Sequence, residues 1–175
     1  MQLRKAAELD PLSSRVWNAL ARIYDGAGDL ERARTSVLRS LEIAPESYSG
    51  PYHLATTWLL QQQPAAALRA IEQFPGSEGN KLCLIAMAEH DLGHLPESRR
   101  ALESAIARFA TPLAFQIAES LAWIGETDRA FEWLERAQAQ NDGGLVMIKY
   151  TPLLRSLRGD PRYAAFLRKL KLPSD

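Results

Sequence analysis

Apolar residues recur along the chain in three columns with a nearly constant step. The first column holds branched apolar residues, each followed by alanine: Leu20, Leu54, Ile85 and Ile117, which are 34, 31 and 32 residues apart. The second column holds small residues: Ala33, Ala67, Ser98 and Ala130. The third holds large apolar residues again: Val37, Ile71, Leu102 and Leu134. A step of about 20 to 50 residues is typical of stacked repeats.

The alternation of large and small residues predicts that each repeat is a pair of helices. Two antiparallel helices pack closely only where one of them presents a small residue to a bulky side chain of the other. Gly28, Gly93 and Gly125 lie between the first and second columns of three repeats, where a chain leaving a helix often needs left-handed backbone dihedrals. The second repeat lacks this glycine and has Pro64, which suits the first turn of its second helix. Each repeat is therefore expected to be helix, turn, helix.

Residues 13 to 45, SSRVWNALARIYDGAGDLERARTSVLRSLEIAP, resemble the tetratricopeptide repeat. The resemblance is carried by residues at the signature places of that family: Trp17, Leu20, Ala21, Tyr24, Gly28, Ala33, Val37 and Pro45. Ala21 stands where glycine is commoner, and Ser40 stands where alanine is commoner. The resemblance implies an all-α fold, a right-handed α-α superhelix of antiparallel helix pairs.

The periodicity and the resemblance together divide the chain into three parts. Residues 1–13 are expected to form the second helix of a truncated repeat, and residues 14–142 four repeats, at 14–47, 48–78, 79–110 and 111–142. After residue 142 the columns stop, and residues 143–175 are expected to be a C-terminal capping segment. Thr151-Pro152 and Asp160-Pro161 each predict a helix start. The helix after Pro161 should bury Phe166 and Leu170 against the fourth repeat.

The C-terminal segment also resembles the ends of tetratricopeptide arrays in bacterial multidomain regulators. That resemblance implies that the chain is the docking or regulatory part of a larger bacterial protein.

Charge and composition narrow the classes of partner. Lysine plus arginine and aspartate plus glutamate number 21 each, so no excess positive charge favours nucleic acid or an anionic membrane. No stretch resembles a signal peptide or a membrane span. The one cysteine, Cys83, cannot form an internal disulfide, which is typical of a reducing compartment. A cytoplasmic protein is expected, with a protein or peptide partner and without nucleic acid, membrane or cofactor.

The sequence offers no arrangement typical of catalysis or of metal binding. No G-x-S-x-G, GxGxxG or P-loop pattern occurs. His90 and His94 are four residues apart, but Gly93 is expected to end the helix between them, and no third ligand is evident. We therefore expect neither catalytic residues nor a metal site.

The tetratricopeptide resemblance implies that the first helix of each repeat lines a concave groove in which a partner peptide binds. The residues expected to face that groove are Asn18, Arg22, Tyr52, His53, Thr56, Cys83, Met87, Phe115 and Glu119. Tyr52 and Phe115 are the predicted anchors, while Arg22 and Glu119 would orient the partner by charge. Met87 and Phe115 are equally well explained as packing between repeats. A carboxylate clamp of the kind found in some chaperone-binding members is not expected, because its lysines are absent.

Self-association is the alternative function. Leu3, Ala6 and Leu9 lie on one face of the first predicted helix, and no preceding helix covers them within this sequence. This exposed apolar face would pair two copies into a homodimer.

Overall fold

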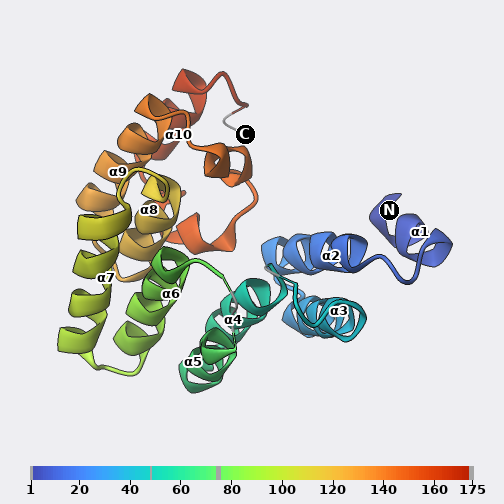
Figure 1. The fold of residues 1–175 in the computed structure, drawn as a ribbon. Coiled ribbons are helices and arrows are strands. Elements are labelled where there is room, and N and C mark those ends of the chain that lie inside the picture. The colour runs from blue at the N-terminus through green and yellow to red at the C-terminus, as the bar shows by residue number, and fades with distance from the viewer. Residues whose placement is uncertain (1, 48, 74–75, 174–175) are drawn as a thin grey trace. The chain divides into compact units, whose positions relative to one another are not determined.

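Every regular element in the described part of the chain is helical, as a computed structural model of residues 2–47, 49–73 and 76–173 shows (Figure 1). The longer helices are α1 (Gln2–Leu9), α2 (Ser14–Ala27), α3 (Leu30–Ile43), α4 (Gly50–Leu60), α5 (Pro64–Glu72), α6 (Glu78–Asp91), α7 (Leu95–Phe109), α8 (Ala114–Trp123), α9 (Thr127–Ala139) and α10 (Pro161–Lys169). Two 3-10 helices, η1 (Gly143–Met147) and η2 (Pro152–Leu157), lie between α9 and α10. The predicted all-α class is confirmed. None of the described helices is both long and apolar enough to cross a bilayer.

Consecutive helices pack as antiparallel pairs around the small residues of the second column. Helix α2 contacts α3, α4 contacts α5, and α8 contacts α9. Ser98, at the start of α7, donates a hydrogen bond of 2.7 Å to the carbonyl oxygen of Ala86 in α6. Ala33, Ala67 and Ala130 are fully buried. These small residues let the two helices of each pair approach closely, as the sequence pattern predicted.

The turn inside each pair uses left-handed backbone. Gly28, Gly93 and Gly125 have φ of 79°, 80° and 86°. In the second pair, which has no glycine at this place, Gln62 adopts φ of 59°. A residue with a side chain is uncommon in that region of dihedral space. The second repeat therefore makes the same kind of turn as the others without glycine.

The chain forms two compact units, residues 1–108 and residues 109–175. The core of the first unit contains Leu20, Val37, Leu59, Ile71 and Leu84. The core of the second contains Ile117, Leu121, Leu134, Leu154 and Leu157. Each unit thus has its own buried centre.

The C-terminal segment packs onto the fourth helix pair with a step close to that of the repeats. Four hydrogen bonds or ion pairs join it to residues 32 or 34 positions earlier: Thr151 to Glu119, Ser156 to the Ala122 carbonyl, Arg162 to Asp128, and Lys169 to Glu135. The apolar columns stop after residue 142, yet the contacts continue at the same spacing. The segment therefore behaves as a shorter further repeat, with η2 against α8 and α10 facing α9.

Helix α10 buries a somewhat different face from the expected one. Phe166 is buried, as expected, together with Tyr163 and Leu167. Leu170 is only half-buried, because it is the C-cap residue beyond the last turn of α10. The Tyr163 hydroxyl donates a hydrogen bond of 2.7 Å to the Ile148 carbonyl. This bond ties α10 to the segment between the two 3-10 helices.

Candidate functional site

The predicted groove residues that keep accessible surface lie on α2 and α4 of the first unit. Arg22, Tyr52 and His53 are half-buried, and we call these three residues the α2–α4 face. The two helices that carry them are in contact, although they belong to successive pairs. The face therefore combines a cation with two aromatic rings.

The geometry of the α2–α4 face fixes the charge state of its histidine. The Tyr52 and His53 rings meet edge to face, with centroids 5.7 Å apart and an interplanar angle of 82°. Burial of the imidazole, and secondarily the nearby positive charge of Arg22, lower the pKa of His53 to about 4. At neutral pH His53 is therefore uncharged, and Arg22 supplies the positive charge of the face.

Two other predicted groove residues of this unit are used within the fold. Asn18 is 7% exposed, and its amide nitrogen donates a hydrogen bond of 3.0 Å to Ser49 Oγ. This bond links α2 to the residue that precedes α4. Thr56 is also 7% exposed and donates a 3.0 Å bond to the carbonyl oxygen of Tyr52 in its own helix. The Asn18 side chain therefore helps to hold successive repeats together, and the Thr56 hydroxyl is used within its own helix.

A buried acid near the α2–α4 face did not emerge from the sequence. Asp25 in α2 is 3% exposed, and the hydroxyl of buried Thr57 lies 3.1 Å from both of its carboxylate oxygens. Burial raises the pKa of Asp25 to about 7, an effect that the Thr57 hydrogen bond partly offsets. An aspartate near the end of a helix usually faces solvent, so its residue type gave no signal of burial. The spacing of 32 residues to a threonine in the next repeat is the signal that could have found it.

The predicted residues of α6 are buried. Cys83 and Met87 are each 1% exposed. At the end of this helix His90 Nδ1 lies 3.4 Å from Asp91 Oδ1, and in the turn that follows it His94 Nδ1 lies 2.7 Å from Glu89 Oε2. Among residues 2–47, 49–73 and 76–173, no group of three or more histidines, cysteines or acids is placed to hold a metal ion. Each of the two histidines is close to a different acid, and the two do not share one site.

The predicted residues of the second unit lie under the C-terminal segment. Phe115 is 2% exposed, and a Cβ added to Gly144 would come within 2.6 Å of its ring. Glu119 is 5% exposed and accepts a hydrogen bond of 2.6 Å from Thr151 Oγ1. Asp142 Oδ2 also accepts a 3.0 Å bond from the Phe115 backbone N–H. While this segment is in place, Phe115 and Glu119 offer a partner no surface.

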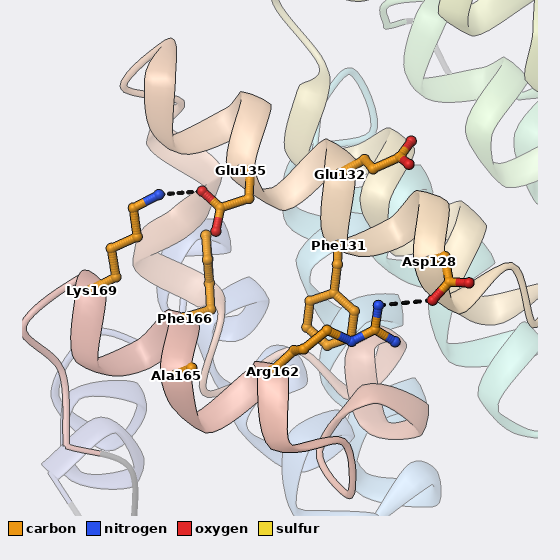
Figure 2. A pocket seen from close by; sticks show the side chains of 8 residues that line it. All are labelled: Asp128, Phe131, Glu132, Glu135, Arg162, Ala165, Phe166 and Lys169. Carbon is orange, nitrogen blue, oxygen red and sulfur yellow. Dashed lines mark hydrogen bonds and ion pairs between the residues drawn. The ribbon is translucent and has the colours of Figure 1, made fainter.

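A pocket of about 420 Å³ lies between α9 and α10 in the second unit (Figure 2). Its walls combine two phenylalanines with charged residues: Asp128, Phe131, Glu132, Glu135, Arg162, Ala165, Phe166 and Lys169. The Arg162 guanidinium lies 4.4 Å from the Phe131 ring centroid and pairs with Asp128 at 2.8 Å. Lys169 pairs with Glu135, as Figure 2 shows. Most of the charge in this pocket is thus engaged in fastening α10 to α9.

The stacked antiparallel helix pairs define an all-α helical-repeat protein. A family model described as tetratricopeptide repeat matches residues 3–35, a range that spans most of α1, all of α2 and the beginning of α3. This match and the helix-pair architecture together fit a tetratricopeptide repeat protein. No curated protein matches the sequence. Tetratricopeptide repeats generally mediate protein–protein interactions as non-catalytic scaffolds.

Proposed function

We propose that this chain is a protein-interaction module that binds a segment of a partner protein on the α2–α4 face. The observation that carries the proposal is the accessibility of Arg22, Tyr52 and His53 on neighbouring first helices of a tetratricopeptide repeat protein. The other predicted groove residues are buried. Binding in the first unit therefore needs no rearrangement of the helix pairs.

The chemistry of the α2–α4 face favours a partner segment that carries an acidic group beside an apolar residue. Tyrosine and arginine are residue types that often dominate the energetics of interfaces. Arg22 can pair with a carboxylate, and the ring of Tyr52 offers apolar contact area with few rotatable bonds. Neutral His53 can donate or accept a hydrogen bond without repelling either charge.

The original expectation that Phe115 and Glu119 extend the binding surface requires the C-terminal segment to leave α8. Several hydrogen bonds and the burial of Leu153, Leu154 and Leu157 oppose that movement. The proposal is therefore confined to the first unit for as long as the segment stays folded.

Site-specific photocrosslinking tests the proposal in cells that make the full chain. A photoreactive phenylalanine replaces Tyr52 in one variant and exposed Arg99 of α7 in a matched control. We expect position 52 to capture a defined protein that position 99 does not capture. Arg22→Glu, combined with the probe at position 52, should remove that product. Equal products from positions 52 and 99, or a product that persists with Arg22→Glu, would place binding elsewhere.

Self-association through α1 is the second candidate function. The observation in its favour is Leu9, which is 78% exposed at the end of α1. Leu3 and Ala6, the other residues of the predicted apolar face, are half-buried. The face that could pair two copies is therefore smaller than expected.

The proposal also includes the kind of protein that contains this chain. The resemblance of the C-terminal segment to the ends of arrays in multidomain bacterial regulators supports a docking role in the cytoplasm within a larger protein. The mass of the cellular protein that contains this sequence would test that role directly.

A further inference from the structure

A second surface, separate from the α2–α4 face, lies between α1 and α3. It is a groove of about 360 Å³ to which three helices contribute: Arg4, Ala7 and Glu8 of α1, Trp17, Leu20 and Tyr24 of α2, and Arg32, Thr35 and Ser36 of α3. We call it the α1–α3 groove. Successive residues of a helix are about 100° apart around its axis, so Trp17, Leu20 and Tyr24 face a different direction from Arg22.

Two arginines surround one aromatic ring in the α1–α3 groove. The Arg4 guanidinium lies 5.6 Å from the centroid of the Tyr24 ring, and that of Arg32 lies 5.9 Å from it. Arg4 Nε also donates a hydrogen bond of 2.9 Å to the Tyr24 hydroxyl. Arg32 pairs with Asp29 at 3.1 Å, whereas Arg4 has no carboxylate partner in the described part of the chain. Two guanidinium groups therefore lie at Tyr24; one of them is paired with Asp29, and Glu8 is the one carboxylate in the groove lining.

Most of the surface of the α1–α3 groove is apolar, although Glu8, Thr35 and Ser36 also line it. One end of the groove is fixed in place. Trp17 Nε1 donates a hydrogen bond of 3.0 Å to the Pro11 carbonyl, which holds the indole against the loop between α1 and α2. Leu12 in that loop is 69% exposed, and Leu9 at the end of α1 is 78% exposed. Exposed leucines beside an aromatic groove are typical of protein interaction surfaces.

We propose that the α1–α3 groove binds an acidic side chain of a partner protein together with a neighbouring bulky apolar residue. The carboxylate would lie beside Arg4 and Arg32 above Tyr24, and the apolar residue would pack on Trp17 and Leu20. Charge complementarity favours this occupant, since the groove lining holds two guanidinium groups against the single carboxylate of Glu8. The apolar floor favours a protein segment over a small hydrophilic anion. This site is independent of the function proposed for Arg22, Tyr52 and His53.

Nuclear magnetic resonance with two matched small probes tests this proposal on the full chain. Phenylacetate carries a carboxylate beside an aromatic ring, and benzylamine carries an ammonium group beside the same ring. The indole N–H signal of Trp17, assigned by its loss in Trp17→Phe, reports binding in the groove. We expect phenylacetate to shift this signal saturably and to bind roughly tenfold more tightly than benzylamine, as a charge-assisted hydrogen bond allows.

Substitutions identify the groups responsible for that preference. Arg4→Gln and Arg32→Gln should each weaken phenylacetate binding several-fold and leave benzylamine binding unchanged or stronger. Arg39→Gln is the matched control, because Arg39 lies on α3 outside the groove and pairs with Glu42. The circular dichroism of each variant checks its fold, and either of the two groove variants suffices for the test.

Three results would overturn the proposal. The first is an equal response to both probes, and the second is a Trp17 signal that neither probe moves. The third is sedimentation showing a dimer of the unmodified chain that Arg4→Gln dissociates, because the groove would then hold a second copy instead of an acidic partner.

Discussion

Thr151 donates a hydrogen bond of 2.6 Å to Oε1 of Glu119, a buried acid 32 residues earlier in the chain. The same relationship joins Thr57 to Asp25, again across 32 residues. In each case a threonine of one repeat step supplies a hydroxyl to an acid in the first helix of the preceding step. In both cases the next step of the stack supplies a hydrogen-bond donor to a carboxyl group whose burial is otherwise costly.

Asp25 should make folding less favourable as the pH rises. Its pKa is about 7 in the folded chain against an ordinary value of 3.8. Between those values the folded carboxyl binds a proton that the unfolded one has lost, so the free energy of unfolding falls with rising pH. Asp25→Asn removes this loss, worth up to about 4 kcal/mol for a shift of this size. In urea denaturation between these pH values, the free energy of unfolding of the variant should increase relative to that of the original chain as the pH rises. A difference that does not change with pH would contradict the raised pKa of Asp25.

His53 should make folding more favourable as the pH rises, the opposite of Asp25, over most of the same pH range. Its pKa is about 4 in the folded chain against an ordinary value of 6.5. Between those values the unfolded imidazole binds a proton that the folded one does not, so the free energy of unfolding rises with pH. His53→Gln should therefore be relatively more stable than the original chain at acidic pH. The two groups offset each other in the original chain, and each substitution exposes the other's effect.

Gly144 is expected to tolerate no side chain. A Cβ there would lie 2.6 to 2.8 Å from three atoms of the Phe115 side chain. Gly144→Ala should lower the free energy of unfolding by about 1 to 3 kcal/mol, the usual cost of overpacking. Gly143→Ala is the matched control, because a Cβ at that position meets nothing within 4 Å. Equal thermal stability of the two variants would mean that the C-terminal segment does not pack on α8 as described.

Truncating the two predicted aromatic anchors, Phe115 and Tyr52, should affect stability and partner affinity to different extents. Phe115→Ala removes a ring that is 2% exposed and should cost about 3 to 5 kcal/mol of stability. Tyr52→Ala removes a half-buried ring and should cost much less stability, but about 2 kcal/mol of affinity for a partner captured at position 52. Denaturation and titration with that partner measure the two effects. A large loss of stability from Tyr52→Ala would make it a core residue.

Leu9→Glu tests self-association through α1. Leu9 is 78% exposed, so the substitution should leave the melting temperature nearly unchanged. If α1 pairs two copies, the charge should shift sedimentation from dimer to monomer. A dimer that persists in Leu9→Glu would place the self-contact elsewhere.

The periodicity of the sequence was enough to predict the helix pairs, because their packing depends on local alternation of large and small residues. Ala33, Ala67 and Ala130 lie where a bulky side chain would separate two helices, and that requirement is visible in the sequence. The turn at Gln62 was predicted in the same way: its position in the repeat indicates a turn, although glutamine does not favour the left-handed backbone found there.

The availability of the predicted groove residues could not be predicted in the same way. Position within a repeat says which face of a helix a residue occupies, but not what later covers that face. Phe115 and Glu119 are buried by a segment whose sequence no longer follows the apolar columns. The burial of Asp25 likewise depends on a side chain 32 residues away. Both outcomes depend on contacts between steps, which a pattern within one step does not contain.

The C-terminal segment also bears on how copies of the chain can meet. A stack that accepts one further step presents a surface on which another molecule could continue it, and such open contacts lead to filaments. On this segment, however, six basic side chains are exposed: Arg155, Arg158, Arg162, Arg168, Lys169 and Lys171. Arg162 and Lys169 are paired with acids, whereas the other four have no ion pair with an acid in the described part of the chain. Two copies brought together through these surfaces would oppose like charges. Tail-to-tail pairing of two copies is therefore discouraged by electrostatic repulsion, and should become easier as salt concentration increases.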